Sequence, residues 1–541
     1  MASVVAAPAA SSKRLALIAA IMGSSVAGID GTVVNVALPS IAGDLGGGLA
    51  GQQWVSNAYL LALGSLILIG GSLGDLFGER RVFALGVAGF GIVSLGCALA
   101  PSIEALIGFR ALQGVFGALL TPSALAVIVS TFNSEERGAA IGTWTAWGAI
   151  ALVLGPLIGG YLIDVANWRW IFAINLPVVA LTLALIFAAV PPRPGREHAR
   201  VDWTGALLCV LGLAGPVFAL IRQPDMGWGH PAVVVPGLGG VAIFAAFLLY
   251  ERRASHPMLE LDLFTRRNFT IGNAETFLMY AGLSILFFFL VLFLQQVAGY
   301  DALEAGLATL PTTGVMFLLS RVMGRLADRR GPRLLMGAGP LVAALGLLLM
   351  LRLDEDTSYL TDLLPAILVF ALGLSMTVAP LTATVLADAD EHNAGIASGI
   401  NNAVARVAGL LGIAALGAVV AAQFSGTLDD RLAGLRLSPA GRAAAAEVRT
   451  RTLAIVDPAG LPAQEGRALQ EASAAASVRA FHVGMGLSAA LVAFGGILGA
   501  VGIVNGRRQV RAEDCPGGQI AGAPRELAQV REPTVPAPVR A

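Results

Sequence analysis

The sequence predicts an all-α integral membrane protein made of two six-helix bundles with two further helices inserted between them. Three observations predict this class. Hydrophobic residues make up 56% of the 541 positions and charged residues only 13%, whereas a soluble chain carries roughly 25% charge. Apolar runs of about twenty residues, the length that crosses a bilayer, recur along most of the chain. One charged motif occurs twice, 253 residues apart, after corresponding helices of the two halves.

Fourteen apolar runs are long enough to span a membrane. The first follows Lys13-Arg14 and resembles a secretory signal, but it continues through Asp30 with no short cleavable region, so we interpret it as an uncleaved span. The predicted spans are 15–38, 53–73, 82–100, 105–131, 138–163, 170–190, 203–222, 232–250, 270–297, 303–327, 334–352, 362–387, 394–422 and 480–504. The predicted domains are a cytoplasmic N-terminus (1–14), an N-terminal bundle (15–190), the inserted helices with flanking loops (191–269), a C-terminal bundle (270–504) and a disordered cytoplasmic tail (505–541).

Arginine placement predicts the orientation. With the N-terminus inside, the inner loops carry thirteen basic residues and the short outer loops three, as the positive-inside rule requires. Both termini are therefore expected in the cytoplasm of a cell whose inner membrane holds the protein. The outer loop 423–479 also carries several arginines, but long loops follow the rule weakly. Within it, Ser438-Pro439 before an alanine-rich segment predicts a capped surface helix.

Composition excludes several function classes. The 35 basic and 35 acidic residues balance, which argues against nucleic-acid binding. Lys13 is the only lysine, so the chain lacks the Gly-Lys pair of an ATP-hydrolysing phosphate loop. The three cysteines and five histidines show no metal-ligand spacing. We expect no metal, no cofactor and no enzyme activity, and a monomer whose partners are lipid, protons and a small-molecule substrate.

The repeated motif is GSLGDLFGERR at 71–81 and GRLADRRGPR at 324–333. Both copies fall on the predicted cytoplasmic face, each after the second helix of a six-helix half, as expected for a duplicated transporter bundle. We interpret them as cytoplasmic gating loops whose arginines anchor to the inner leaflet or pair with acids. A solvated turn that obeys the charge rule is the alternative for either copy alone. The motif residues are Gly71, Asp75, Gly78, Arg80 and Arg81 in the first copy and Gly324, Asp328, Gly331 and Arg333 in the second.

With four further stretches, this turn resembles the major facilitator superfamily, in its fourteen-helix drug:proton antiporter branch. The stretches are IDGTVVNVALP at 29–39, FRALQGVFGALLTP at 109–122, GPLIGG at 155–160 and NWRWIFAINLP at 167–177. The resemblance implies two halves that rock around a midplane site and export drugs in exchange for protons, with the proton gradient as energy source. Trp168 and Trp170 of the last stretch are expected to anchor the outer membrane interface.

Asp30 lies in the outer part of the first span, with no basic residue near it in sequence. A carboxylate is costly in hydrocarbon, and acids inside membrane spans are usually functional. We expect Asp30 to be neutral when buried and ionised when water reaches it, as a proton carrier requires. An acid packed against a structural partner is the alternative. The resemblance implies the functional role, because the motif aligns Asp30 with the family's drug- and proton-handling acid.

Arg110 begins the matching motif of the fourth span, which Gln113 and Gly114 complete. Its guanidinium stays charged at any working pH, so it cannot carry the proton but can act on a neighbouring carboxylate. The resemblance associates this arginine with proton transfer. An arginine that reaches out of the membrane near a helix end is the alternative.

Glycine and proline residues mark the fifth span. Proline bends a helix, and small residues four apart allow close helix packing. The resemblance implies a bend typical of antiporters, whereas a packing kink without influence on transport direction is the alternative. The residues are Gly148, Gly155, Pro156, Gly159 and Gly160.

Three charges interrupt later spans: Glu275, Arg321 and Arg406. Each is expected within a turn or two of the inner surface, where contact with the interface or a salt bridge explains it as well as function does. Glu275 is the second-choice coupling acid, because it places a titratable group in the second half.

The function expected from these features is proton-coupled efflux of hydrophobic or cationic small molecules such as drugs or antibiotics. Three alternatives stay open. One is a dedicated exporter of one endogenous metabolite, such as a self-made antibiotic or a siderophore. Another is a symporter, which the glycine-rich fifth span disfavours. The last is a non-transporting membrane sensor that uses 423–479 to bind a ligand or a partner.

Overall fold

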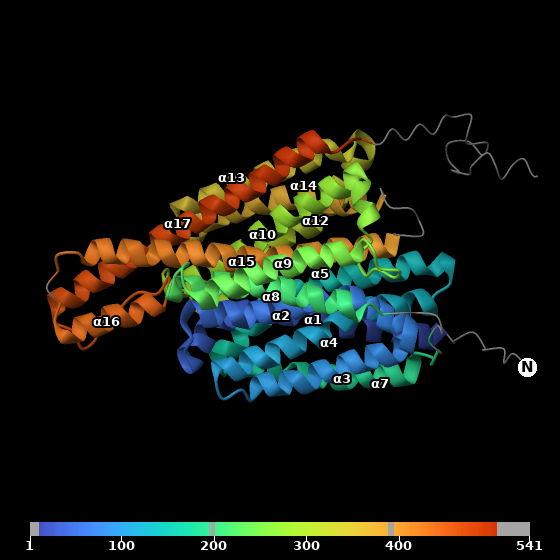
Figure 1. The fold of residues 1–541 in the computed structure, drawn as a ribbon, viewed down its shortest axis with the longest axis horizontal. Helices are drawn as coiled ribbons and strands as arrows, with labels where there is room; N and C mark the ends of the chain where they lie inside the picture. Colours follow the sequence, from blue (N-terminus) through green and yellow to red (C-terminus); the bar gives the residue numbers. More distant parts are fainter. Residues whose placement is uncertain (1–9, 194, 196–200, 388–393, 436, 506–541) are drawn as a thin grey trace, which may run out of the picture. The chain divides into compact units, whose positions relative to one another are not determined.

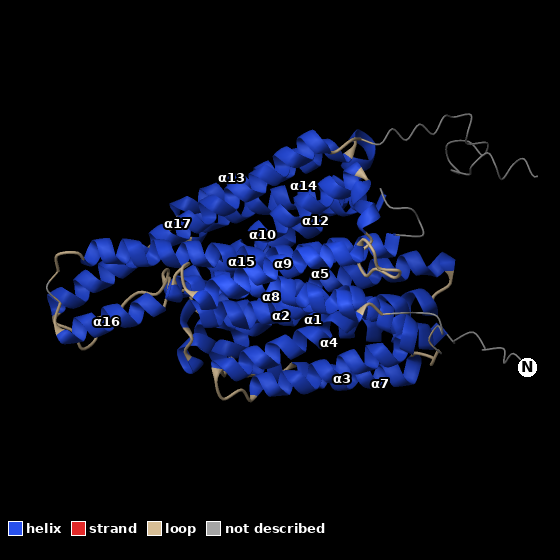
Figure 2. Ribbon diagram, in the orientation of Figure 1, coloured by secondary structure: helices blue, strands red, loops and turns tan. Residues whose placement is uncertain are grey.

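The computed structural model describes residues 10–193, 195, 201–387, 394–435 and 437–505, and all regular elements in these ranges are helices (Figure 2). Thirteen of the described helices are long and apolar enough to cross a membrane, and they match thirteen of the predicted spans. The remaining span, 138–163, falls on a helix whose described apolar part is Leu154–Val165. The all-α membrane class is confirmed, the number fourteen stays a prediction, and the predicted tail from 506 onward lies outside the described residues.

The N-terminal half is a bundle of helices that contact one another. The first helix continues through Pro39 and is longer at both ends than the predicted span 15–38. The helices are α1 (Ala10–Leu45), α2 (Gly48–Phe77), α3 (Glu79–Ala98), α4 (Ile103–Thr131), α5 (Ser134–Val165), the short α6 (Trp170–Ala173) and α7 (Asn175–Ala189).

The C-terminal half forms a second bundle. Its helices are α10 (Arg267–Gln296), α11 (Ala302–Ala308), α12 (Leu310–Arg330), α13 (Pro332–Leu349), α14 (Leu364–Ala387), α15 (Ala394–Leu432), α16 (Pro439–Thr450) and α17 (Ala463–Gly502). Three short segments complete it: η1 (Leu261–Thr265), η2 (Met350–Arg352) and η3 (Tyr359–Leu363).

The inserted pair is α8 (Trp203–Met226) and α9 (Pro231–Glu251). The two helices pack closely because glycines meet backbone at their contact: a side chain on Gly215 would collide with Gly240, and one on Gly240 would collide with Pro216. Helix α8 also contacts α2 of the first half and α15 of the second. The pair therefore covers the seam at which these two helices meet.

The end of the unit at which α1 begins is the predicted cytoplasmic end, and we call it the inner end and the opposite one the outer end. Figure 1 shows that α16 and the adjoining ends of α15 and α17 lie at the far side from the start of α1. Both repeated turns lie at the inner end, because α2 and α12 run back toward the start of α1 and end there.

The segment 423–479, predicted as a long outer loop, is mostly helical. Helix α15 continues to Leu432, and α17 begins at Ala463. Alanine-rich sequence favours helix, and buried Phe424, Leu428 and Leu469 give the extensions an apolar core. The capped surface helix is confirmed as α16: Pro439 is its first residue, and the Ser438 hydroxyl accepts a hydrogen bond from the Gly441 N–H at 3.1 Å.

Buried apolar residues form one continuous core at the outer end and separate cores at the inner end. The outer core joins the two halves, with Val36 of α1 and Phe289 of α10 in the same cluster. At the inner end, Phe83 and Ile128 belong to a cluster of the first half alone. The inner cluster of the second half receives one side chain from the first half, the partly buried Leu68 of α2. The two halves are thus sealed together at the outer end.

Candidate functional site

A buried ion pair joins α1 and α4. Asp30 is 0% exposed and Arg110 is 1% exposed. The Arg110 Nη1 donates to Asp30 Oδ2, and its Nε donates to the carbonyl of Val55 at 3.1 Å. Two charges removed from water are tolerated only when each is paired and hydrogen-bonded. Both partners meet this condition, because each has the other's opposite charge and at least one further hydrogen bond.

Polar side chains from α3, α4 and α7 complete the hydrogen bonding of Asp30. The Gln113 Nε2 donates to Asp30 Oδ1 at 3.0 Å and to the Ser94 hydroxyl at 2.9 Å, while its Oε1 accepts from Arg110 at 2.6 Å. The Asn175 Nδ2 lies 3.4 Å from Asp30 Oδ1 and 3.3 Å from Ser94. Side chains of α4 and α7 therefore hold the carboxylate directly, and Ser94 of α3 bonds to Gln113 and Asn175. We call Asp30, Arg110, Gln113, Ser94 and Asn175 the Asp30 network.

Aromatic rings enclose the arginine. The Arg110 guanidinium lies 4.4 Å from the ring centre of Tyr59 and 5.8 Å from that of Phe172. The Tyr59 hydroxyl donates to the carbonyl of Ala27 at 3.0 Å, so the ring is fixed between α1 and α4. Gly114 allows this approach, because any side chain there would collide with the backbone of Tyr59. Cation–π contacts strengthen when water is excluded, as it is here.

The structure brings three of the four predicted coupling residues together: Asp30, Arg110 and Gln113. Arg110, eighty residues away in sequence, is a packed partner of the kind that the alternative interpretation of Asp30 requires, and the role of Asp30 as a proton carrier stays a prediction. Sequence reasoning missed Ser94 and Asn175. Asn175 lies in the NWRWIFAINLP stretch, to which we had assigned only anchoring.

The anchoring interpretation is wrong for Trp168. Its ring is 3% exposed, its Nε1 donates to Asp44 Oδ2 at 3.0 Å, and it packs edge-on against Phe172. Trp170 is 53% exposed, as the prediction requires. The stretch therefore has two roles. It places Phe172 and Asn175 at the Asp30 network, and it exposes Trp170 on the outside of the protein.

Glu275 lies apart from the Asp30 network, inside the C-terminal bundle. It is 0% exposed, and neither carboxyl oxygen has a hydrogen-bond partner among the described residues. Its Oε2 faces Gly499 of α17, next to the carbonyl of Met336 of α13. A carboxylate without a partner is costly in such surroundings, so the site favours the neutral acid.

The two repeated turns share one backbone geometry and one arginine contact. Gly78 and Gly331 separate consecutive helices with φ of 89° and 85°, a left-handed conformation that glycine adopts readily. Arg80 donates to the carbonyl of Phe187 at 3.2 Å near the end of α7, and Arg333 donates to that of Ala500 at 2.5 Å near the end of α17.

Carbonyls in the last turn of a helix lack partners within the helix and attract cations. In each half the template arginine therefore caps the last helix of its own bundle. The anchoring of Arg80 and Arg81 to the inner leaflet, or their pairing with acids, stays a prediction. Arg81 and Asp328 are exposed, and so are Gly71 and Asp75, whereas Gly324 is half-buried.

The glycines of α5 make two close contacts at the outer end. Gly155 and Gly159 face Thr32 and Val33 of α1, and Gly160 faces the backbone of α11. Gly148, nearer the inner end, has no atom within 4 Å of a side chain built on it. The residues at and after Pro156 thus allow α5 to contact both halves, while the predicted bend at Pro156 stays a prediction.

Hydrogen bonds between the halves also lie at the outer end. The Leu303 N–H donates to Asp164 Oδ2 at 2.9 Å, Gln295 Nε2 donates to the carbonyl of Val36 at 2.9 Å, and Gln53 Nε2 donates to that of Ile413 at 2.8 Å. Gly142 of α5 and Gly324 of α12 lie nearer the inner end, and a side chain built on either would meet nothing within 4 Å. The hydrogen bonds and the shared apolar core that join the halves thus lie at the outer end.

Comparison with known proteins identifies the family. Residues 20–413 match the family model described as Major Facilitator Superfamily. The chain belongs to the Major Facilitator Superfamily. Similar members include the puromycin resistance protein pur8 of Streptomyces alboniger, 40% identical over 74% of this chain and 80% of the relative. The tetracenomycin C resistance and export protein of Streptomyces glaucescens is 34% identical over 87% of each chain. The multidrug resistance protein Stp of Mycobacterium tuberculosis is 33% identical over 80% of this chain and 81% of the relative.

Solved structures show the same fold. A bacterial homolog of the human lysosomal transporter Spinster, in an inward-facing and unoccupied conformation, matches with a TM-score of 0.60 at 17% identity, covering 91% of this chain and 98% of that one. The xylose transporter XylE of E. coli, in an inward open conformation, matches with a TM-score of 0.55 at 13% identity, covering 91% and 97%. The chain is thus a multi-pass transporter of the cytoplasmic membrane with the major facilitator fold, related to drug and antibiotic exporters.

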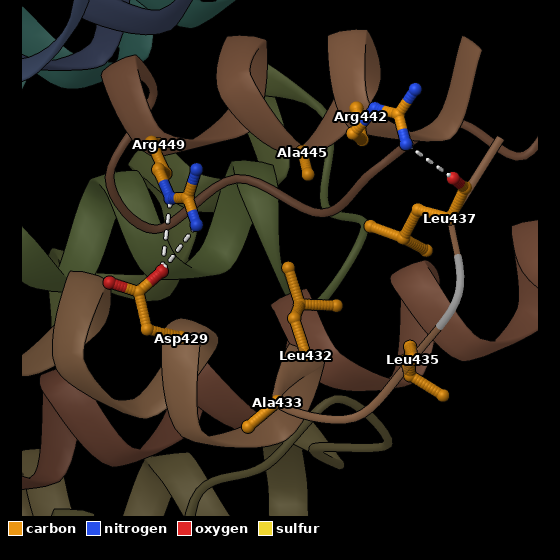
Figure 3. Close-up of a pocket in the computed structure, with 8 residues that line it drawn as sticks. All are labelled: Asp429, Leu432, Ala433, Leu435, Leu437, Arg442, Ala445 and Arg449. Carbon is orange, nitrogen blue, oxygen red and sulfur yellow. Dashed lines mark hydrogen bonds and ion pairs between the residues drawn. The ribbon is translucent and has the colours of Figure 1, made fainter. Parts of the chain in front are cut away.

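A pocket of about 730 Å³ lies outside the segment that matches the superfamily model, between the end of α15 and α16 (Figure 3). Arg449 donates two hydrogen bonds to Asp429 Oδ1, at 3.0 and 2.5 Å, across it, and Arg442 donates to the carbonyl of Leu437 at 3.0 Å. Exposed ion pairs of this kind contribute about 0–1 kcal/mol. The residues that line it are Asp429, Leu432, Ala433, Leu435, Leu437, Arg442, Ala445 and Arg449. The pocket holds none of the Asp30 network.

Proposed function

We propose that the protein exports hydrophobic small molecules, drugs or antibiotics among them, in exchange for protons. Membership of the superfamily supports small-molecule transport, and the names of the relatives support drug efflux. The observation that carries the coupling is the Asp30 network, an acid inside the membrane-spanning region whose charge is balanced by one arginine. The proton gradient is the energy source, and each charge moved across the membrane gains about 2.3 kcal/mol per 100 mV.

In this scheme the Asp30–Arg110 pair is the switch. The scheme takes the paired arrangement of the structure, in which Arg110 and Gln113 donate to the Asp30 carboxylate, as the substrate-binding state. When a proton from the outer side binds Asp30, the Coulomb attraction disappears and Arg110 is left with an unbalanced charge. Because a buried unpaired charge is strongly unfavourable, the protonated network favours a different packing of α1 against α4. Release of the proton to the inside restores the pair and the substrate-binding state.

The coupling is tested by Asp30→Asn in everted membrane vesicles. The compounds are puromycin and tetracenomycin C, named in two relatives, together with ethidium. We expect gradient-driven, uncoupler-sensitive transport of at least one compound by the wild type, and loss of that transport in Asp30→Asn. Asp44→Asn is the matched control, because Asp44 lies on the same helix with 52% of its side chain exposed. Undiminished gradient-driven transport in Asp30→Asn removes Asp30 from the mechanism.

Export of a single endogenous metabolite is a second candidate. It is favoured by two Streptomyces relatives whose names each give a single compound. They are the tetracenomycin C resistance and export protein and a probable actinorhodin transporter of Streptomyces coelicolor, which is 32% identical over 83% of this chain. A susceptibility panel on a deletion strain separates the two. Sensitivity to many unrelated compounds supports broad efflux, whereas sensitivity to one compound supports the dedicated exporter.

A further inference from the structure

Arg406 is a charged residue deep inside a membrane-spanning helix. It lies twelve residues after the start of α15 at Ala394, which corresponds to about 18 Å along the helix axis at 1.5 Å per residue. The hydrocarbon core of a bilayer is about 30 Å thick. The expectation that Arg406 lies within a turn or two of the inner surface is therefore wrong, because α15 begins more than three turns before it.

Among the residues that the structure describes, the guanidinium of Arg406 has no hydrogen-bond or ion-pair partner. The residue is exposed, and no described side chain or carbonyl forms a hydrogen bond or an ion pair with it. The expected salt bridge is thus absent from the described part of the chain.

The neighbours of α15 show that Arg406 faces the space between the two halves. On one side, Gly399 packs against Leu68 of α2, and a Cβ built on Gly64 of α2 would lie 3.1 Å from the Cβ of Arg406. On the other side, Asn401 donates to Thr276 of α10 at 2.8 Å. The Arg406 position lies between these two faces of the helix, as does the exposed Asn402 one turn nearer the inner end.

The other described charged residues at this depth are either paired with an opposite charge or fully buried. Asp30 and Arg110 neutralise each other and are 0% and 1% exposed, and Glu275 is 0% exposed inside the C-terminal bundle. Arg321 lies on α12, and its side chain is outside the described part. The described charge that faces the space between the halves is therefore positive. An unpaired ion within a membrane faces a water-filled path or a ligand.

We propose that Arg406 selects the substrate by charge, so that the exported compounds are lipophilic organic anions with a carboxylate or phenolate group on an aromatic body. This inference rests on the proposed function and names its substrate class. The planar guanidinium binds a carboxylate through two parallel hydrogen bonds, and its flat face stacks on aromatic rings. The cationic substrates expected from the sequence find no unpaired acid in this space among the described residues.

The selection is tested by binding rather than by transport, so that its failure is separate from failure of proton coupling. Binding of two xanthene dyes of similar size, the anionic fluorescein and the cationic rhodamine 123, is measured by fluorescence anisotropy on full-length protein in an uncharged detergent. We expect the wild type to bind fluorescein at least tenfold more tightly than rhodamine 123. Arg406→Gln should abolish this preference by weakening fluorescein binding alone, and Arg406→Lys should keep part of it.

The matched control is Arg431→Gln, which removes an exposed arginine of the same helix at the outer end and should leave both affinities unchanged. Three results would overturn the inference. The wild type binds both dyes equally, the wild type binds neither dye, or Arg406→Gln weakens the binding of both dyes equally. Competition of fluorescein by phosphatidylglycerol at similar concentration would also overturn it, because a lipid anion would then be the ligand. If one of these results is found while the protein still transports ethidium in a proton-driven way, the charge selection is refuted and the proposed function is retained.

Discussion

Asp30 and Glu275 are both fully buried acids, one in each half, yet their surroundings are opposite. Asp30 accepts hydrogen bonds from Arg110, Gln113 and Asn175. Glu275 accepts none among the described residues and faces two apolar helices. In the first half the protein stabilises a charge that a proton can remove, whereas in the second half it stabilises an acid that already holds its proton. Burial alone therefore does not define a coupling acid, and the partner decides which charge state the fold favours.

The largest expected effect is that of Arg110→Gln. It leaves the Asp30 carboxylate buried without a cation, which costs about 3–5 kcal/mol of folding stability, and it abolishes transport. Thermal unfolding in detergent measures the loss, with Arg449→Gln as control, because the Arg449–Asp429 pair is exposed at both side chains. Adding Asp30→Asn to Arg110→Gln should recover most of the stability. A double variant as unstable as Arg110→Gln alone would show that the charge of Asp30 is not the cause.

Gly499→Ala tests the close packing around Glu275. A Cβ at this position would lie 2.6 Å from both Glu275 Oε2 and the carbonyl of Met336, and overpacking of this kind costs about 1–3 kcal/mol. Gly486→Ala on the same helix meets nothing within 4 Å and should leave the melting temperature unchanged. Equal melting temperatures of the two variants would contradict the described packing of α17 against α10.

Glu275→Gln sharpens the comparison with the first half. Because the neutral acid already fits the site, a neutral amide of the same shape should change the free energy of unfolding by less than about 1 kcal/mol, whereas Asp30→Asn leaves Arg110 unpaired and costs several times as much. The measurement is again thermal unfolding in detergent, with both variants side by side. A loss in Glu275→Gln as large as in Asp30→Asn would mean that Glu275 is ionised and paired.

The smallest effect is expected at the outer hairpin. Asp429→Asn removes an exposed ion pair with Arg449, which contributes about 0–1 kcal/mol, and it should leave transport unchanged. Vesicle transport and the melting temperature check this. A selective loss of transport in this variant would give the hairpin pocket a role that the Asp30 network does not predict.

Much of the fold could be predicted from the sequence, because apolar runs and a repeated charged turn are local signals. The buried partners could not, because they come from distant helices. Arg110 meets Asp30 across eighty residues, and Ser94 and Asn175 are ordinary polar residues until α3 and α7 place them beside it. The depth of Arg406 was misjudged for a similar reason: it depends on where α15 begins. The outer extensions of α15 and α17 could not be predicted, because their alanine-rich sequences are too polar to be recognised as spans, whereas α16 was predicted from its cap.

Proton release on substrate binding tests the central claim most directly. Purified protein in weakly buffered detergent is acidified until its affinity for a compound that the vesicles export begins to fall, so that part of the population is protonated. The compound is then added, and a pH indicator dye records the protons released. The Asp30 account predicts release from the wild type and from Glu275→Gln, and none from Asp30→Asn. Release that persists in Asp30→Asn and disappears in Glu275→Gln would contradict it and would assign proton exchange to the second half.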